Sequence, residues 1–251
     1  MRLVRMALGF AFGLYALFAA MALGLLIGTI GVAPFAVFPR GRREPYAMVA
    51  ASAWAWVLVH GVLLARVEVR GDSGLQAGEG ALIFCNHRSW LDPLVLMYAL
   101  RSNGLSKRII LWLPVIGLYG WLSGAVFFDR RSRAQRTRAR KEVLDLVQTG
   151  HRVQVFPEGT RSRDGRLREK VYLTLALDAF RRGLAVVPCA IHGSERVMPV
   201  PTVGAFPLQR ATLSIQTALR PDDYDNAHTF AQACWQAVTQ QFRALEAEAT
   251  G

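Results

Sequence analysis

The stretch FCNHRSWLDP, at 84–93, places two side chains that can move a proton directly after an apolar run. His87 and Asp92 are five residues apart, and the run ALIFC at 81–85 predicts a buried strand before them. A loop of this length can fold back, so that Asp92 accepts a hydrogen bond from one ring nitrogen of His87 and leaves the other nitrogen free as a base. Asp92 also precedes Pro93, where aspartate is a preferred helix cap, so capping is a second interpretation of this residue.

The sequence around this pair supplies no obvious nucleophile. It contains no G-x-S-x-G turn of the kind that α/β-hydrolases use, and the His87–Asp92 spacing does not match common metal-ligand spacings. Cys85 lies two residues before His87, where a histidine can activate a thiol, but its place after ALIF favours a core position. A base without its own nucleophile suits a reaction in which a substrate hydroxyl attacks a second substrate, with neither metal nor cofactor.

A second polar cluster, PEGTRSRDGRLREK at 157–170, follows the apolar run VQVF. It is rich in arginine, which is well suited to holding a phosphate through two hydrogen bonds, and Gly159 permits close approach of the backbone to a ligand. A solvated surface turn is the alternative, and it fits residues 163–170 better than residues 158–161, which abut the strand. The cluster therefore predicts a phosphate site beside the histidine.

The order of elements places both clusters at one edge of a sheet. Candidate strands are 67–70, 81–85, 125–128, 153–156, 185–191 and 213–217, and candidate helices begin near Pro93, Ser132, Lys170 and Tyr224. This alternation predicts an α/β fold with a largely parallel central sheet flanked by helices. Ligands of open α/β sheets bind beyond the carboxyl ends of the strands, which is where the polar clusters lie.

The N-terminal region predicts a membrane-embedded helical hairpin. The chain is 52% hydrophobic yet carries a net charge of +12, and no charged residue occurs from Met6 to Pro39 or from Pro45 to Ala65. Roughly 20 apolar residues suffice to cross a bilayer. A cleaved signal peptide is the alternative, but the apolar stretch continues well beyond Ala22 and a second one follows. We expect a two-helix membrane anchor at 1–66 and a catalytic domain at 67–251.

Two further patterns bear on the partners of the chain. Seven of the twelve residues from Arg130 to Lys141 are basic, which indicates an anionic partner or a solvated helix face. Attachment to a membrane makes nucleic acid an unsuitable partner and membrane lipids suitable ones. The three cysteines are far apart, so they predict neither a disulfide framework nor a zinc cluster.

Four sequence blocks together resemble the glycerolipid acyltransferase family, most closely the bacterial 1-acylglycerol-3-phosphate (lysophosphatidate) acyltransferases. The blocks are NHRSWLD at 86–92, GAVFFDR at 124–130, FPEGTRS at 156–162 and VVPCAIHG at 186–193. The first contains the N-H-x4-D pattern of the family, which is weak evidence alone. Its combination with FPEGTR at this spacing is highly specific, and the hairpin before it also fits the family.

The resemblance implies a role for each matching residue. His87 would be the general base and Asp92 its orienting partner, while Pro188 would shape the acyl or acceptor pocket. The implied acceptor-binding residues are Arg130, Glu158, Gly159, Thr160 and Arg161. The chain departs from the family pattern at Lys170, which is followed by Val171 and Tyr172 rather than by a small residue. This departure leaves the identity of the acceptor open.

The implied activity is transfer of a fatty acyl group from an acyl thioester, either acyl-CoA or acyl carrier protein, to lysophosphatidate. The alternatives are another lysolipid or glycerol 3-phosphate as acceptor, or a noncatalytic membrane-binding protein on the same scaffold. An intact His87–Asp92 pair disfavours the noncatalytic alternative, and a lipid hydrolase would need a nucleophile that the motifs lack.

The expected location is the inner membrane of the cell, with the catalytic domain facing the cytoplasm. Arg40, Arg42 and Arg43 lie between the two apolar segments. If both segments crossed the bilayer, these arginines would lie opposite the basic N-terminus, which the positive-inside tendency disfavours. We therefore expect a hairpin that enters only the cytoplasmic leaflet.

Overall fold

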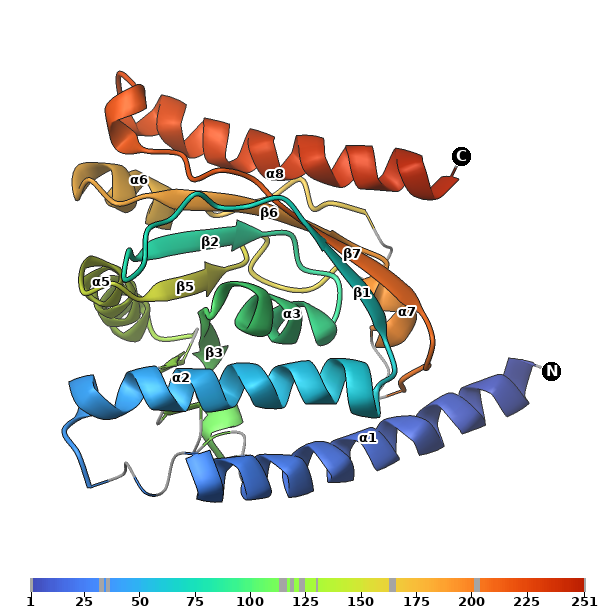
Figure 1. Ribbon diagram of the computed structural model, residues 1–251. Coiled ribbons are helices and arrows are strands. Elements are labelled where there is room, and N and C mark those ends of the chain that lie inside the picture. Colours follow the sequence, from blue (N-terminus) through green and yellow to red (C-terminus); the bar gives the residue numbers. More distant parts are fainter. Residues whose placement is uncertain are drawn as a thin grey trace.

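The computed structural model describes residues 2–31, 34, 37–112, 117, 120–121, 125–129, 131–162, 166–200 and 204–250. Two N-terminal helices, α1 (Arg2–Gly31) and α2 (Arg40–Val57), lie side by side below the rest of the molecule (Figure 1). A π-helical turn, η2 (Leu58–Val62), continues α2 toward the first strand. Both helices are long and apolar enough to cross a membrane by length and composition.

A seven-stranded sheet forms the centre of the molecule, with strand order β1-β7-β6-β2-β5-β3-β4. All neighbouring strands are parallel except β6 and β7, which are antiparallel. The prediction of a largely parallel sheet is therefore confirmed. The strands are β1 (Arg66–Arg70), β2 (Ala81–Cys85), β3 (Asn103–Lys107), β4 (Val126–Phe128), β5 (Arg152–Val155), β6 (Val186–His192) and β7 (Arg210–Ile215).

The sheet contains one strand, β3, that the sequence pattern does not indicate. Its sequence NGLSK begins with asparagine and glycine, which are depleted in strands. Hydrogen bonds to two neighbouring strands stabilise β3 despite its low strand propensity, because β3 lies between β5 and β4 and pairs with both. The tertiary structure therefore creates this strand from a polar segment.

Four helices that flank the sheet begin close to the predicted positions, namely α3 (Leu91–Leu100), α5 (Arg133–Gln148), α6 (Thr174–Arg181) and α8 (Ala227–Thr250). Three short elements, η3 (Arg108–Trp112), α7 (Ser194–Val197) and η4 (Pro221–Asp223), correspond to no predicted helix. The predicted start at Ser132 is confirmed, since its hydroxyl caps α5 by accepting a hydrogen bond from the Gln135 N–H. The predicted start of α8 near Tyr224 is early, because the Asn226 side chain accepts the first N–H bonds of that helix.

The two faces of the sheet carry different helices. Ala81, Ile83 and Cys85 of β2 belong to a core cluster with α3, η2 and part of α1. Leu82 and Phe84 belong to a second cluster with α5, α6 and α8. Both clusters bury β2 completely, which explains why its sequence is a continuous apolar run rather than an alternating one. The anchor helices and α5 therefore lie on opposite faces of the sheet.

The second anchor helix, α2, is attached along its length to the part of the chain that contains the sheet. The Glu44 carboxylate lies 3.0 Å from Nε2 of His151, and the Ser52 hydroxyl donates to the Met97 carbonyl of α3. The Trp54 indole donates to the Ala20 carbonyl of α1, which joins the two anchor helices. One face of α2 therefore packs on protein, while side chains such as Tyr46, Val49 and Trp56 on its other face are exposed. The domain boundary at residue 66 stays a prediction.

The end of β6 depends on a glycine in a left-handed conformation. Gly193 has φ +84°, and a Cβ atom there would lie 2.5 Å from the Arg210 carbonyl oxygen of β7. Gly78 also has positive φ, +78°, but no atom lies within 4 Å of the equivalent Cβ position. Both glycines thus adopt a left-handed backbone conformation, but only Gly193 is closely packed against another strand.

We expect Gly193→Ala to lower the free energy of unfolding by clearly more than Gly78→Ala. The backbone strain alone costs about 1 kcal/mol, and the contact with the β7 carbonyl adds to it only at Gly193. Chemical unfolding of the detergent-solubilised variants measures both values. Equal losses of unfolding free energy in the two variants would show that the close contact between β7 and Gly193 does not contribute to the cost of the substitution.

Candidate active site

The predicted pair of proton-moving residues is formed in the structure. His87 lies just beyond β2, and its Nδ1 is 2.9 Å from Oδ2 of Asp92, whose side chain is fully buried. Nδ1–H therefore donates to the carboxylate, which fixes the tautomer with Nε2 as the free, basic nitrogen. The His87 side chain keeps 16% of its surface exposed, and Nε2 has no bonding partner within the described ranges. It can therefore reach a bound substrate.

The Asp92 carboxylate also determines the shape of the loop before it. The same oxygen, Oδ2, accepts hydrogen bonds from the backbone N–H groups of Arg88 and Ser89, at 2.6 and 2.8 Å. Asp92 lies in the first turn of α3 rather than at its cap position, which Trp90 occupies. The capping interpretation is thus replaced by a related one, in which Asp92 holds the preceding loop against the helix.

Two contacts from a neighbouring loop hold the backbone of His87. Its N–H donates to Oε1 of Glu158 at 2.9 Å, and its carbonyl accepts from the Ser162 N–H at 2.9 Å. The ring of Phe156 stacks on the imidazole, with centroids 4.0 Å apart. All three contacts come from the loop after β5, which is the strand next to β2. The first and third sequence blocks therefore meet because their strands are neighbours.

Asn86 is a positioning residue whose role the sequence did not reveal. Its side chain is fully buried and makes two hydrogen bonds of 2.8 Å to the backbone of Ile191, one as donor and one as acceptor. These bonds tie the histidine loop to β6, the strand on the other side of β2. The N of the N-H-x4-D pattern was the available signal, since an asparagine directly after an apolar strand needs a partner when buried.

Glu158 lies in a different environment from the one expected of an acceptor-binding residue. It is 2% exposed, and besides the His87 N–H it accepts a hydrogen bond from the Arg168 backbone. Burial raises its pKa to about 7, with a further contribution from the nearby negative charge of Asp92. Within the described structure, Glu158 thus holds the backbone of two neighbouring loop segments. Its implied role in acceptor binding stays a prediction.

Arg161 is arranged as an anion-binding residue should be. Its guanidinium lies 3.8 Å over the ring of Trp90, which belongs to the histidine loop. Partial burial lowers its pKa, and no carboxylate lies within ion-pair distance of it in the described parts of the chain. Arg161 is therefore a held, uncompensated positive charge beside the His87–Asp92 pair.

The remaining predicted residues lie at different distances from this centre. Gly159 takes a left-handed conformation, φ +68°, against the Tyr172 ring, and Thr160 beside it is exposed. Pro188 is buried inside β6, where its carbonyl accepts from Gln216 N–H of the neighbouring chain segment. Arg130 is outside the described residues. The roles implied for these four residues stay predictions.

Cys85 occupies the core position that the apolar pattern favoured. Its side chain is fully buried, and this burial raises its thiol pKa well above the usual value. A thiol in this state is a poor nucleophile, because the thiolate is the reactive form. The geometry therefore favours the histidine as the reactive group on this loop.

Comparison with known proteins identifies the family. A family model described as Acyltransferase matches residues 66–192, which is more than half of the chain. The chain belongs to this acyltransferase family. The matched residues include the His87–Asp92 pair, the loop after β5 and all of β6.

Individual relatives agree with this assignment. A chloroplastic 1-acyl-sn-glycerol-3-phosphate acyltransferase of Brassica napus is 32% identical over 73% of this chain and 53% of its own length. The human 1-acyl-sn-glycerol-3-phosphate acyltransferase alpha is 39% identical over 40% of this chain and 36% of its own. The chain thus matches about half the length of the first of these relatives and less of the second.

One solved structure shares the whole fold. The crystal structure of the 1-acyl-sn-glycerophosphate (LPA) acyltransferase from Thermotoga maritima superposes with a TM-score of 0.82. The match covers 98% of each chain at 22% sequence identity. The two N-terminal helices are therefore part of a shared architecture, and the predicted fold class is confirmed.

The raised pKa of Glu158 predicts a pH-dependent stability. The folded chain holds this proton more tightly than the unfolded chain, whose carboxyl has the ordinary pKa of 4.5. The resulting stabilisation is complete below about pH 4.5 and is lost as the pH rises through about 7. Glu158→Gln cannot ionise, so its free energy of unfolding should rise relative to wild type over this interval, by a few kcal/mol at most.

Chemical unfolding of wild type and Glu158→Gln, measured in parallel between about pH 5 and about pH 8, checks this prediction. Taking the difference between the two proteins cancels the titration of all other groups. A difference that is constant over this range would contradict a buried carboxyl that ionises near pH 7.

Proposed function

We propose that the protein is a membrane-bound O-acyltransferase that transfers a fatty acyl group from a thioester to the free hydroxyl of lysophosphatidate, forming phosphatidate. The observation that carries the proposal is a His87–Asp92 pair with a free Nε2 beside the uncompensated guanidinium of Arg161. A base and an arginine that can bind phosphate lie in one site, and this pair matches an acceptor that carries both a hydroxyl and a phosphate. The names of the relatives support the same activity.

The arrangement supports direct transfer without a covalent enzyme intermediate. Nε2 of His87 removes the proton of the acceptor hydroxyl as its oxygen attacks the thioester carbonyl carbon. The tetrahedral intermediate collapses with cleavage of the carbon–sulfur bond, and the imidazolium returns the proton to the departing thiolate. Asp92 stabilises the imidazolium between these two steps. No protein nucleophile takes part, which agrees with the burial of Cys85.

The site offers the phosphate a prearranged charge. The Arg161 guanidinium is held over the ring of Trp90, so it loses little freedom on binding an anion. Stacking also leaves the edge of the guanidinium available for paired hydrogen bonds to phosphate oxygens. Gly159 and Thr160 lie directly before Arg161 in the same loop, where a backbone N–H and a hydroxyl can add to the phosphate contacts.

The membrane location rests on the N-terminal helices. Side chains such as Leu3, Phe10, Phe18, Leu25 and Ile30 of α1 are exposed, and an 18-residue stretch of this helix has a mean hydropathy of 2.3. The attachment of α2 to α3 keeps this apolar helix beside the catalytic part, where a lipid acceptor is supplied directly from the bilayer. We propose that the hairpin is embedded in one leaflet on the cytoplasmic side of the inner membrane.

The activity is tested by incubating the purified protein with a labelled acyl donor and a panel of acceptors comprising lysophosphatidate, other lysolipids and glycerol 3-phosphate. We expect phosphatidate as the main product. His87→Ala should lower kcat by about 10² to 10⁴-fold, because a general base is lost. Asp92→Asn should cost less, since the ring remains. A rate near that of wild type in His87→Ala would refute the mechanism.

Arg161→Ala provides the matched comparison for this assay. It removes a charge without touching the base, so it should raise the KM for the acceptor far more than the KM for the donor. Thermal unfolding of each variant shows whether the fold is retained. Preference for a lysolipid without a phosphomonoester would move the chain to another acceptor class within the family.

The direct-transfer mechanism makes a separate prediction for Cys85. Cys85→Ala should retain most of the activity, and donor alone should leave no acyl mass on the intact wild-type protein. Mass spectrometry of the protein after incubation with donor detects any adduct. A thioester-linked adduct on Cys85, together with loss of activity in Cys85→Ala, would replace direct transfer by a two-step mechanism.

A further inference from the structure

A strongly basic surface lies just before α5 and on its N-terminal turns. It consists of exposed side chains from the end of the β4–α5 connection and from the first turns of the helix. We call this set the α5 basic surface, and its members are Arg131, Arg133, Arg136, Arg138 and Lys141. None of these residues belongs to the His87–Asp92 site, and the proposed reaction uses none of them.

Much of this charge is not neutralised within the protein. Arg131, Arg133 and Arg138 have no carboxylate within ion-pair distance in the parts of the chain that the structure describes. Lys141 of the same surface lies 2.8 Å from Asp145, and the half-buried Arg140 lies 2.9 Å from Asp178. The inward-facing arginine thus has a structural partner, whereas these three exposed arginines project into solvent.

The position of these charges is unfavourable for the helix itself. The N-terminus of a helix carries a partial positive charge, and cations in the first turn are destabilising there. Arg133 is the first residue of α5 and Arg136 lies one turn later, while the first turn contains no acidic residue. A charge pattern that opposes local stability indicates a role outside the fold.

The surface is close to the reaction edge of the sheet but away from the membrane anchor. α5 begins shortly after β4, which runs parallel to the other strands of its half of the sheet, so the helix starts at the edge where the histidine loop lies. Its buried side chains belong to the cluster with α6 and α8. The anchor helices pack on the other face (Figure 1). The first turns of α5 therefore lie on the opposite face of the sheet from the anchor helices.

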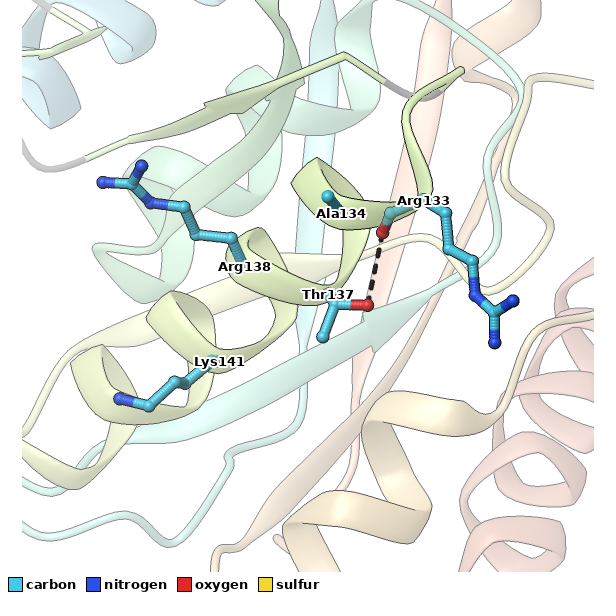
Figure 2. Close-up of a pocket in the computed structure, with 5 residues that line it drawn as sticks. All are labelled: Arg133, Ala134, Thr137, Arg138 and Lys141. Atoms are coloured by element: carbon cyan, nitrogen blue, oxygen red, sulfur yellow. Dashed lines mark hydrogen bonds between the residues drawn. The ribbon is translucent and has the colours of Figure 1, made fainter.

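The side chains do not converge on one point. Figure 2 shows Arg138 and Lys141 directed to one side of α5 and Arg133 to the other, with Ala134 and Thr137 between them. The depression that these five residues line is shallow and open. A single phosphate cannot contact all these charges, whereas an extended acidic surface can. The arrangement therefore fits a macromolecule rather than a small anion.

We propose that the α5 basic surface docks an acidic protein, namely an acyl carrier protein that presents the acyl thioester to His87. This inference rests on the proposed acyl transfer and decides between its two donor classes. An acidic carrier bound at α5 lies at the reaction edge, on the face of the sheet opposite the anchor helices. Charge complementarity of this kind raises the rate of encounter and fixes the orientation of the partner.

The test compares two donors with the same acyl chain, acyl-CoA and acyl carrier protein, on the variant Arg133→Glu/Arg138→Glu. Both positions are exposed, and a glutamate at the first residue of α5 favours the helix dipole, so the fold is retained. We expect the KM for the carrier-bound donor to rise about tenfold or more, and the KM for acyl-CoA to change less than about twofold. Added salt should raise the wild-type KM for the carrier-bound donor.

Arg210→Glu/Arg243→Glu is the matched control, because it changes the net charge equally at exposed arginines on β7 and α8. We expect this control to leave the KM for both donors unchanged. Equal effects of the α5 variant on the two donors, or no effect on either, would overturn carrier docking. Loss of binding to vesicles containing phosphatidylglycerol, with the KM for the carrier-bound donor unchanged, would assign the surface to lipid instead.

Direct binding separates this inference from the proposed function. Unloaded acyl carrier protein is titrated against wild type and the α5 variant in detergent, without any turnover. Binding to wild type that the α5 variant loses supports docking, even if the wild-type protein acylates no acceptor from either donor and the proposed function fails. Absence of binding to wild type at low salt would overturn the docking proposal by itself.

Discussion

A single buried carboxylate oxygen organises the reactive loop. Oδ2 of Asp92 accepts hydrogen bonds from the His87 ring and from two consecutive backbone N–H groups. These three hydrogen bonds stabilise a negative charge that would otherwise be costly to bury, and they leave the imidazole one orientation and one tautomer. Because the loop cannot change shape without breaking these bonds, the free nitrogen of His87 points to a fixed place. Arg161, the proposed phosphate-binding residue, can then be positioned relative to this nitrogen.

The rest of the site is assembled from the strands on either side of β2. Glu158 and Ser162, after β5, hold the N–H and the carbonyl of His87, and Asn86 ties the same loop to Ile191 of β6. Each of these bonds joins segments that are distant in the chain, so the site forms only when the sheet has formed. The geometry of the reaction is thus coupled to strand order, and not to the histidine loop alone.

The two faces of the sheet divide the substrates of the proposed reaction. In the proposed reaction and docking, the lipid acceptor comes from the side of α1 and α2, and the carrier-bound donor comes from the side of α5, whose exposed surface is basic. The carboxyl edge of the sheet is where the two approaches meet. This division explains how one chain can combine a high apolar content with a net charge of +12.

The sequence by itself determined the features that rest on local patterns. The apolar stretches before residue 66 specified two long helices, the uninterrupted ALIFC specified a strand buried on both faces, and Ser132 specified the start of α5. The spacing of His87 and Asp92 also sufficed to predict their hydrogen bond, since a five-residue loop restricts where the two side chains can meet.

The tertiary structure decided what depends on contacts between distant segments. The strand β3 exists because two neighbours pair with a polar segment, and Glu158 is a buried acceptor for the His87 backbone because β5 lies beside β2. The same holds for the stacking of Arg161 on Trp90. Residue type predicts which group can bind a ligand, but burial and partner depend on strand order, which local sequence patterns do not specify.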